Sequence, residues 1–218
     1  MVSEGISGEL LVDLHPRLYH MASDGSWPGI QRHGLLSTSA LLDLFEIIGE
    51  ERDALESRHR RETVPIRHPR HGTAWIRDQK PMTDEGVRRA LAGTSLTPAD
   101  WYRLLNRRVF FWTTEERLDR MLGAAPYRHH YHTVLTVDTR ILLDRHQDRV
   151  TLSPINSGAT RPYPSPRGPA TFQPIATFPY ERYRRLRSTL GAVVELAVDR
   201  AVPDIAEVVL DVQRVRHE

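Results

Sequence analysis

The order of the periodic segments constrains the fold of this chain more than any other feature. Helical spacing of apolar residues dominates the first half of the 218 residues, and short strand patterns dominate the second half. The strand signals are "YHTVLTVDT", "RVTLSPIN", "AVVELAVD" and "AEVVLDVQRV", and "RAVPDI" joins the last two. This layout predicts one α+β domain over residues 1–218, with a central, mostly antiparallel sheet flanked by helices.

Composition excludes several classes of site. The chain has no cysteine, so disulfides, thiolate metal sites and a cysteine nucleophile are excluded. No apolar run approaches the roughly 20 residues that span a bilayer, and the N-terminal segment lacks the pattern of a signal peptide. We therefore expect a soluble, cytoplasmic protein with no membrane partner.

The basic residues are nearly all arginine, since Lys80 is the single lysine, and the net charge is +2. Arginine binds phosphate and stacks on bases better than lysine does. The bias is mild support for an anionic partner, and it is also common in proteins coded by GC-rich genomes.

Capping signals place several helices. "WPGIQRHGLL" (27–36) predicts a short helix ended by Gly34, and residues 37–61 show helical spacing after a Ser or Thr cap. Thr97 and Pro98 open a further helix. "VFFW" (109–112) predicts a buried strand, and "EERLDRMLGA" predicts a helix after it.

Three segments are less regular. "LYH" reads as the end of a short strand, which places His20 at its last position. Residues 62–86 read as a long loop with a short strand at "TAWIR". Residues 157–180 are the richest in proline and glycine, and such a loop in a compact chain indicates a functional loop.

Three ordered segments carry a family resemblance. "LYH", a helix and "GLLS" stand near the N-terminus, "NRRVFFWTTEERLDRML" stands in the middle, and "VVELAVDRAVPDIAEVVL" stands near the C-terminus. Together they resemble the ADP-ribosyltransferase superfamily, most nearly DarT-type DNA ADP-ribosyltransferases and the RNA 2'-phosphotransferases.

The resemblance implies an ADP-ribosyltransferase-like fold with a split sheet, and NAD as the cofactor. It implies transfer of ADP-ribose to a macromolecular target, with DNA or RNA as the acceptor. It further implies a toxin or defence effector, whose partner would be an antitoxin or immunity protein.

Glu195 is the predicted catalytic carboxylate. Transfer from NAD breaks the bond between nicotinamide and ribose, and a carboxylate near the ribose hydroxyls stabilises the positive charge that develops on the sugar. Glu195 stands inside the apolar run "GAVVELAVD", where a carboxylate is costly without a partner. Strand alternation puts it on a face with Val193 and Ala197, which favours a pocket over a solvated face.

His20 and Ser37 are the predicted cofactor ligands near the N-terminus. In the superfamily a histidine after a short strand binds the cofactor, and a neutral imidazole suits a ribose hydroxyl. The "GLLS" turn would close the pocket, with Ser37 offering its hydroxyl. The alternative for His20 is a core histidine satisfied by the backbone.

Arg77 is the second predicted catalytic residue. The resemblance implies an essential arginine before the central strand, which could bind the pyrophosphate or the acceptor through a bidentate fork. Arg67 and Arg70 compete for this role. The alternative for Arg77 is a loop arginine paired with Asp78.

Aromatic and polar residues complete the predicted site. Where many superfamily members have a stacking tyrosine, this chain offers Phe111 or Trp112, although core packing explains a phenylalanine equally well. Asn156 and Ser157 lie in a polar turn after a strand and could donate to a ligand, and Gly158 allows close approach of the backbone.

The proline-rich segment suggests a second kind of contact. Arg161, Tyr163 and Arg167 interleave charge with an aromatic ring, as grooves for single-stranded nucleic acid do.

A histidine cluster gives a rival hypothesis. His130 and His132 would share one face of a strand beside His129, and His68 or His71 could supply a third metal ligand. A solvated strand start explains the same residues, and we predict no metal site.

Three alternatives to ADP-ribosyl transfer stay open. An RNA 2'-phosphotransferase would not depend on Glu195 in the same way. A non-catalytic module of the same fold would bind nucleotide or nucleic acid without turnover. A histidine-based metal hydrolase would need bound metal.

Overall fold

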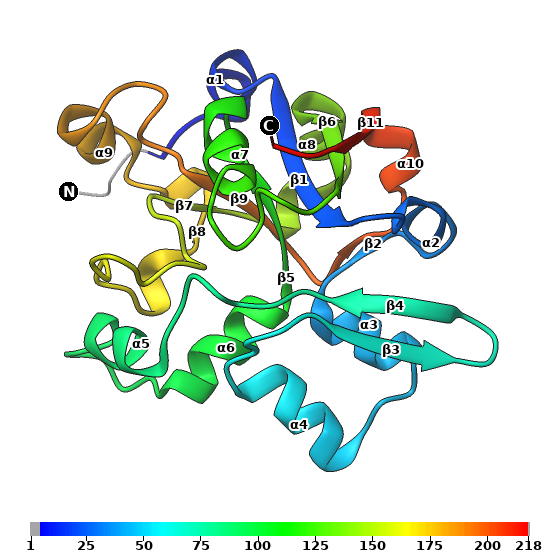
Figure 1. Ribbon diagram of the computed structural model, residues 1–218. Helices are drawn as coiled ribbons and strands as arrows, with labels where there is room; N and C mark the ends of the chain where they lie inside the picture. The colour runs from blue at the N-terminus through cyan, green and yellow to red at the C-terminus, as the bar shows by residue number, and fades with distance from the viewer. Residues whose placement is uncertain (1–4, 218) are drawn as a thin grey trace.

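A central antiparallel sheet organises the computed structural model, which describes residues 5–217. Within these residues seven strands pair in the order β11-β6-β1-β5-β9-β7-β8. Their bounds are β1 Arg17–Ser23, β5 Arg108–Trp112, β6 His132–Asp138, β7 Val150–Ser153, β8 Gln173–Pro174, β9 Glu195–Asp199 and β11 Val209–Val215. Helices flank the sheet (Figure 1), so the predicted α+β class is confirmed. The first strand of the chain lies inside the sheet, so strands come from both halves of the sequence.

Within the main sheet, β1 and β5 share the shortest stretch of paired residues. β1 pairs with β6 along its whole length, from Arg17 to Ser23, whereas its register with β5 joins Tyr19 to Trp112 alone in the described chain. Among the described residues, β1 and β5 are thus joined at a single bridge. His20 lies within β1 and not at its end, because pairing with β6 carries the strand to Ser23.

Helices on both faces of the sheet bury its apolar side chains. The largest core cluster joins β1, β5, β6, β7 and β9 to α1 Gly8–Leu14, α8 Thr139–His146 and α10 Ile205–Val208. α7 Glu115–Leu122 packs Leu118 and Leu122 against Met21 and Val134 in a separate cluster. The remaining short elements of this part are α9 Tyr180–Leu186, η1 Gln147–Arg149, η2 Pro169–Thr171 and η3 Ile175–Thr177.

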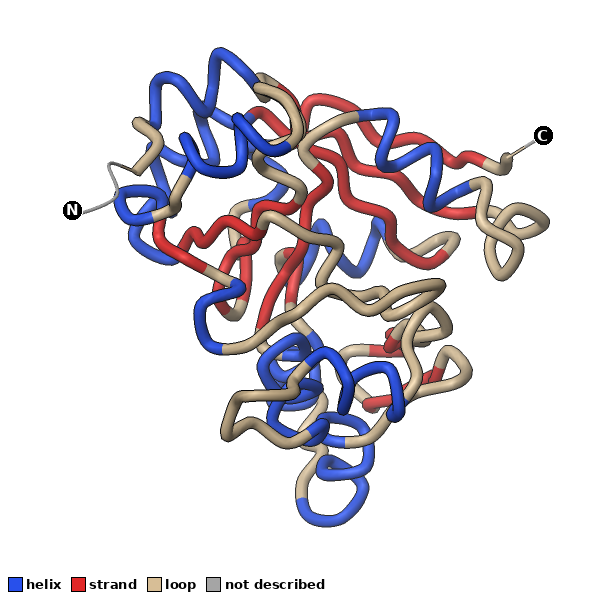
Figure 2. Tube along the Cα trace, turned by 90° about the vertical axis from the view of Figure 1, so that its left-hand side faces the viewer, coloured by secondary structure: helices blue, strands red, loops and turns tan. Residues whose placement is uncertain are grey.

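A second group of elements lies below the sheet in the views of Figures 1 and 2. It consists of α3 Thr38–Leu44, α4 Gly49–Ser57, α5 Asp84–Ala90, α6 Pro98–Asn106 and the hairpin of β3 Val64–His68 with β4 Gly72–Ile76. One cluster packs α3 and α4 on the hairpin. Another packs α5 and α6 on Phe172 and Ala197, which fixes this group against the sheet.

The predicted caps form. Thr97 and Asp100 make a reciprocal capping box at the start of α6. α2 Trp27–His33 ends at Gly34, whose φ is 84°. Directly after it, β2 Leu35–Leu36 pairs with β10 Ala201–Val202, which joins the N-terminal "GLLS" turn to the C-terminal segment.

Three local predictions were wrong. Residues 37–61 form two helices, because the left-handed backbone of Glu46 (φ 56°) and Gly49 (φ 63°) ends α3 before α4 begins. Residues 62–86, which we expected to form a long loop, form a hairpin and the start of α5, which Thr83 caps, although the strand expected at "TAWIR" does form as β4. The strand at "AVVELAVD" begins only at Glu195, so Val193 packs in the main core and does not share the face of Glu195.

Residues 5–217 contain no helix with the length and apolar character that crossing a bilayer requires. The first four residues of the N-terminal segment, for which we predict no signal peptide, lie outside the described residues, as does residue 218.

Candidate functional site

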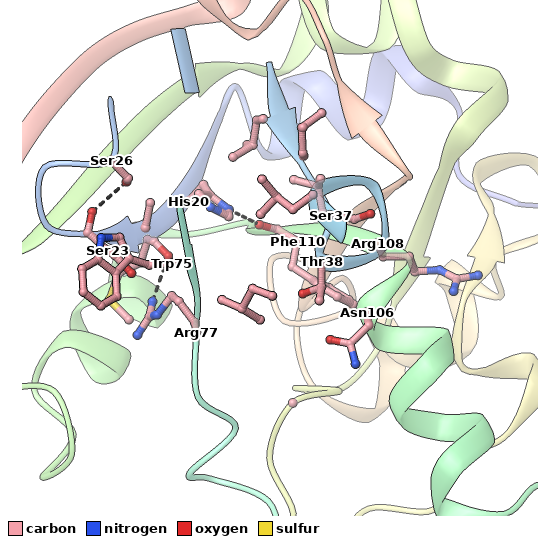
Figure 3. Close-up of a pocket in the computed structure, with 18 of the residues that line it drawn as sticks. His20, Ser23, Ser26, Ser37, Thr38, Trp75, Arg77, Asn106, Arg108 and Phe110 are labelled. Atoms are coloured by element: carbon pink, nitrogen blue, oxygen red, sulfur yellow. Dashed lines mark hydrogen bonds between the residues drawn. The ribbon is translucent and has the colours of Figure 1, made fainter. Parts of the chain in front are cut away.

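A cavity of about 410 Å³ lies where the sheet meets the group of elements below it, and Figure 3 shows part of its wall. Every residue that the sequence predicts for the site lines this cavity: His20, Ser37, Arg77, Phe111, Trp112, Asn156, Ser157 and Glu195. The fold therefore brings together side chains from both ends and the middle of the chain.

Glu195 is the first residue of β9 and lies opposite Trp112 of β5 and Ser153 of β7. Its side chain is only 4% exposed. Burial raises the pKa of Glu195 to about 7, although hydrogen bonds from Ser157 and the charge of Arg167 favour the ionised form. The Ser157 backbone N–H donates to both carboxylate oxygens, at 3.1 Å each. Near neutral pH this carboxyl can therefore hold or release a proton.

His20 presents a neutral imidazole to the same cavity. Its Nδ1 lies 2.8 Å from the Phe110 carbonyl oxygen (Figure 3). A carbonyl only accepts, so Nδ1 carries the hydrogen and Nε2 is left as an acceptor. Burial lowers the pKa of His20 to about 4, so the ring is uncharged at neutral pH. The backbone contact fixes the tautomer without occupying Nε2.

Arg77 follows β4 and is held by uncharged groups. Its Nη1 donates to the Met21 carbonyl at 2.8 Å, and the guanidinium lies 5.1 Å from the ring centroid of Tyr127. Burial lowers the pKa of Arg77, since the charge is removed from water. Within residues 5–217 no ion pair joins Arg77 to Asp78. The Asp78 carboxylate instead accepts a hydrogen bond from the Tyr127 hydroxyl at 2.7 Å. Among residues 5–217 the guanidinium is thus a cation at the cavity wall without a carboxylate partner.

The competing arginines lie elsewhere. Arg67 and Arg70 are exposed on the β3–β4 hairpin, and neither is among the described residues that line the cavity. Arg70 donates to Glu46 at 2.9 Å. Of the three arginines, Arg77 is therefore the one in position to contact a ligand in the cavity.

Strand alternation separates the two predicted stacking residues. Phe111 is 1% exposed and belongs to the main core, so its ring packs with apolar side chains. Trp112 is partly exposed, as is Phe110, which sequence reasoning missed. Trp112 and Phe110 therefore offer the aromatic surface of β5 to the cavity, and the interpretation of Phe111 as a stacking residue is not supported by its position.

Two predicted polar ligands already have backbone partners. The Ser37 hydroxyl caps α3 by accepting the Ala40 N–H at 3.2 Å. The Asn156 carboxamide oxygen accepts the Gly158 N–H at 3.1 Å, and its side chain is exposed at the cavity. Ser37 thus shapes the wall as a cap, and Asn156 keeps its amide donors for other contacts.

A family model covering residues 16–209 matches this chain. The chain belongs to DUF7002, a family of unknown function. No curated protein and no solved structure matches it. Family membership leaves the chemistry to be inferred from the cavity.

The histidines of the rival metal hypothesis are not brought together. His130 precedes β6, so it cannot share a strand face with His132, whose Nε2 contacts the Tyr127 carbonyl at 3.0 Å. His68 and His71 stack on each other on the hairpin, with centroids 4.7 Å apart. Residues 5–217 contain no group of three or more side chains arranged to hold a metal ion.

The three residues of the proline-rich loop that we expected to contact nucleic acid differ in their exposure. Tyr163 and Arg161 are exposed, whereas Arg167 is 5% exposed and donates to loop carbonyls. Arg167 cannot reach a nucleic acid from that position.

Buried polar residues that the sequence did not indicate support the cavity wall. Arg60 donates to the Arg77 carbonyl at 3.1 Å and to the Asn106 side chain at 2.8 Å, while its own N–H donates to Gln79. In the sequence, Arg60, Gln79 and Asn106 stand in no motif that marks them as buried. No local signal could therefore have predicted this network. It holds the segment that carries Arg77.

Proposed function

We propose that this protein is an NAD-dependent ADP-ribosyltransferase of ADP-ribosyltransferase-like fold, which transfers ADP-ribose to a macromolecular acceptor, with nucleic acid as the favoured class. One observation carries the proposal. Glu195 and His20, which come from opposite ends of the sequence, line the same cavity.

The chemical groups around the cavity suit NAD. Its volume of about 410 Å³ lies in the range of small-molecule sites. NAD has two phosphates, two planar heterocycles and ribose hydroxyls. Arg77 offers a guanidinium for phosphate, Trp112 and Phe110 offer aromatic faces, and the neutral ring of His20 offers an acceptor for a hydroxyl.

Glu195 would supply the electrostatic stabilisation. When bound, NAD supplies an activated ADP-ribosyl group, because nicotinamide leaves with the electron pair of the glycosidic bond. The ionised Glu195 carboxylate would accept a hydrogen bond from a ribose hydroxyl and stabilise positive charge on the sugar. It could also take the proton that the acceptor loses on attack, since its pKa is about 7.

Incubation with labelled NAD and separate pools of DNA, RNA and protein tests the proposal. We expect label in a nucleic-acid pool, and loss of at least about 10²-fold in rate for Glu195→Gln. Glu181→Gln, an exposed carboxylate paired with Arg184, is the matched control and should label normally. Absence of label in every pool with the wild-type protein would contradict the proposal.

The same variant separates the alternatives. Removal of a 2'-phosphate from RNA that continues in Glu195→Gln would favour an RNA 2'-phosphotransferase. NAD binding by the wild-type protein without any turnover would favour a non-catalytic module. The same proposal extends to the role that the resemblance implies, a toxin or defence effector, whose antitoxin or immunity protein would bind over the cavity.

A further inference from the structure

The loop of residues 154–168 covers the Glu195 carboxylate. It leaves the sheet after β7, and its Ser157 N–H is the backbone donor to both Glu195 oxygens. A donor shared equally between the two oxygens lies close to the axis of the carboxyl group, so it fixes the position of the carboxylate and the direction of its Cγ–Cδ axis. The placement of Ser157 therefore decides how Glu195 is presented to the cavity.

The guanidinium of Arg167 lies at the centre of this loop. Its Nη1 donates to the Ser157 carbonyl at 2.8 Å, its Nη2 to the Ala159 carbonyl at 2.7 Å and its Nε to the Ser165 carbonyl at 3.2 Å. The group also lies 5.4 Å from the ring centroid of Trp101. One side chain thus ties the outgoing and returning arms of the loop together.

The far part of the loop is anchored to α5 and the segment before it. The Arg167 N–H donates to the Ala90 carbonyl at 2.9 Å, and the Thr160 N–H donates to the Pro81 carbonyl at 3.0 Å. The Thr83 N–H donates to the Thr160 hydroxyl at 3.0 Å. These bonds hold the base from which the Arg167 side chain reaches back to Ser157.

The partners of the charged Arg167 guanidinium are backbone carbonyls of its own loop. Among residues 5–217, no carboxylate forms an ion pair with it, and its charge favours the ionised form of Glu195. Burial lowers the pKa of Arg167 to about 10, which leaves it charged at neutral pH. A buried charge without a carboxylate is costly unless its hydrogen bonds are made, and here backbone carbonyls make them.

We propose that Arg167 is a positioning residue, whose guanidinium fixes Ser157–Ala159 so that the Ser157 amide orients the Glu195 carboxylate in the cavity. The catalytic meaning of this arrangement rests on the proposed function, but the arrangement itself does not. Its test therefore needs a readout that works without turnover.

The first measurement uses the wild-type protein. Its glutamate carboxyl carbons are labelled with ¹³C and its backbone with ¹⁵N, and Glu195→Gln assigns the Glu195 signal. We expect the Ser157 amide shift to titrate with the same midpoint as the Glu195 carboxyl. An Ser157 amide that does not follow that midpoint would overturn the proposal without any variant at Arg167.

The second measurement uses substitutions in the loop. Arg167→Met keeps an unbranched side chain as far as the position of Nε but removes the guanidinium donors, and the Ser157 titration step should be lost. Arg167→Lys keeps the charge but cannot span three carbonyls, so the step should shrink. Arg161→Met, at an exposed position of the same loop, should keep the full step. A full step in both Arg167 variants would contradict the proposal.

Folding and function are separated from positioning. Thermal unfolding identifies a variant that does not fold. If Arg167→Met does not fold, the titrations of Arg167→Lys and of the wild type test the proposal. If the protein turns over NAD, Arg167→Lys should lower kcat more than it changes KM. If it does not, the proposed function fails while the titration result still stands.

Discussion

Glu195 and Trp112 lie directly opposite each other where β9 pairs with β5. Opposite residues of an antiparallel pair point to the same face, with Cβ atoms about 4.5–5.5 Å apart. The carboxylate and the aromatic ring that the sequence suggested therefore share one wall of the cavity. Phe111, one residue earlier, points into the core on the other face.

Substitution of these aromatic residues should separate binding from stability. Trp112→Ala should weaken NAD binding by about 1–3 kcal/mol, the range for loss of one stacking contact. Phe111→Ala should instead lower the free energy of unfolding by about 3–5 kcal/mol, because it empties a buried site. Isothermal titration with NAD and urea unfolding measure the two effects, and the reverse pattern would contradict the assignment of faces.

The protonation of Glu195 should make stability depend on pH. Its pKa is raised from 4.5 to about 7, so the folded state binds the proton more tightly than the unfolded state. This contribution, about 3 kcal/mol, is present below pH 4.5 and is lost as pH rises to about 7. Glu195→Gln should remove the loss and be more stable than the wild type at pH 8.

His20 contributes with the opposite sign. Its pKa is lowered from 6.5 to about 4, so its contribution is present above pH 6.5 and is lost as pH falls toward 4. Urea unfolding of the wild type and of Glu195→Gln from pH 4 to pH 8 separates the contributions of Glu195 and His20.

For Glu195, one result would contradict the burial of an ionised carboxyl: a Glu195→Gln protein that is less stable than the wild type at pH 8.

Arg77 should act on the phosphates of a ligand. Arg77→Met should weaken binding of ADP-ribose by at least about 10-fold, because a charge-assisted contact contributes about 1.5–3 kcal/mol. Arg70→Met, on the exposed hairpin and paired with Glu46, is the matched control. Isothermal titration with ADP-ribose measures both, and equal affinities of the two variants would argue against an anion site at Arg77.

Local signals predicted the parts of the structure that depend on local chemistry. Thr97 and Gly34 cap the helices that they were expected to cap, and β5 forms at "VFFW". The break at Glu46 was missed because its left-handed backbone has no residue-type signal. The candidate site was found through the order of motifs along the chain. The loop contacts of Arg167 and the network of Arg60 depend on long-range geometry, which periodicity does not encode.

We expect Gly34 to be required for stability where β2, which follows it, pairs with β10. Its φ of 84° and ψ of 167° lie in a region that only glycine adopts readily, and a Cβ there would lie 2.6 Å from the Pro203 Cα atom. Gly34→Ala should therefore lower the free energy of unfolding by about 1–3 kcal/mol or more, from backbone strain alone. Gly29→Ala, in the helix just before it, would meet no atom within 4 Å and should be neutral or stabilising by about 0.5–1 kcal/mol. Urea unfolding at pH 7 compares the two, and equal stabilities would show that the β2–β10 contact tolerates a side chain at Gly34.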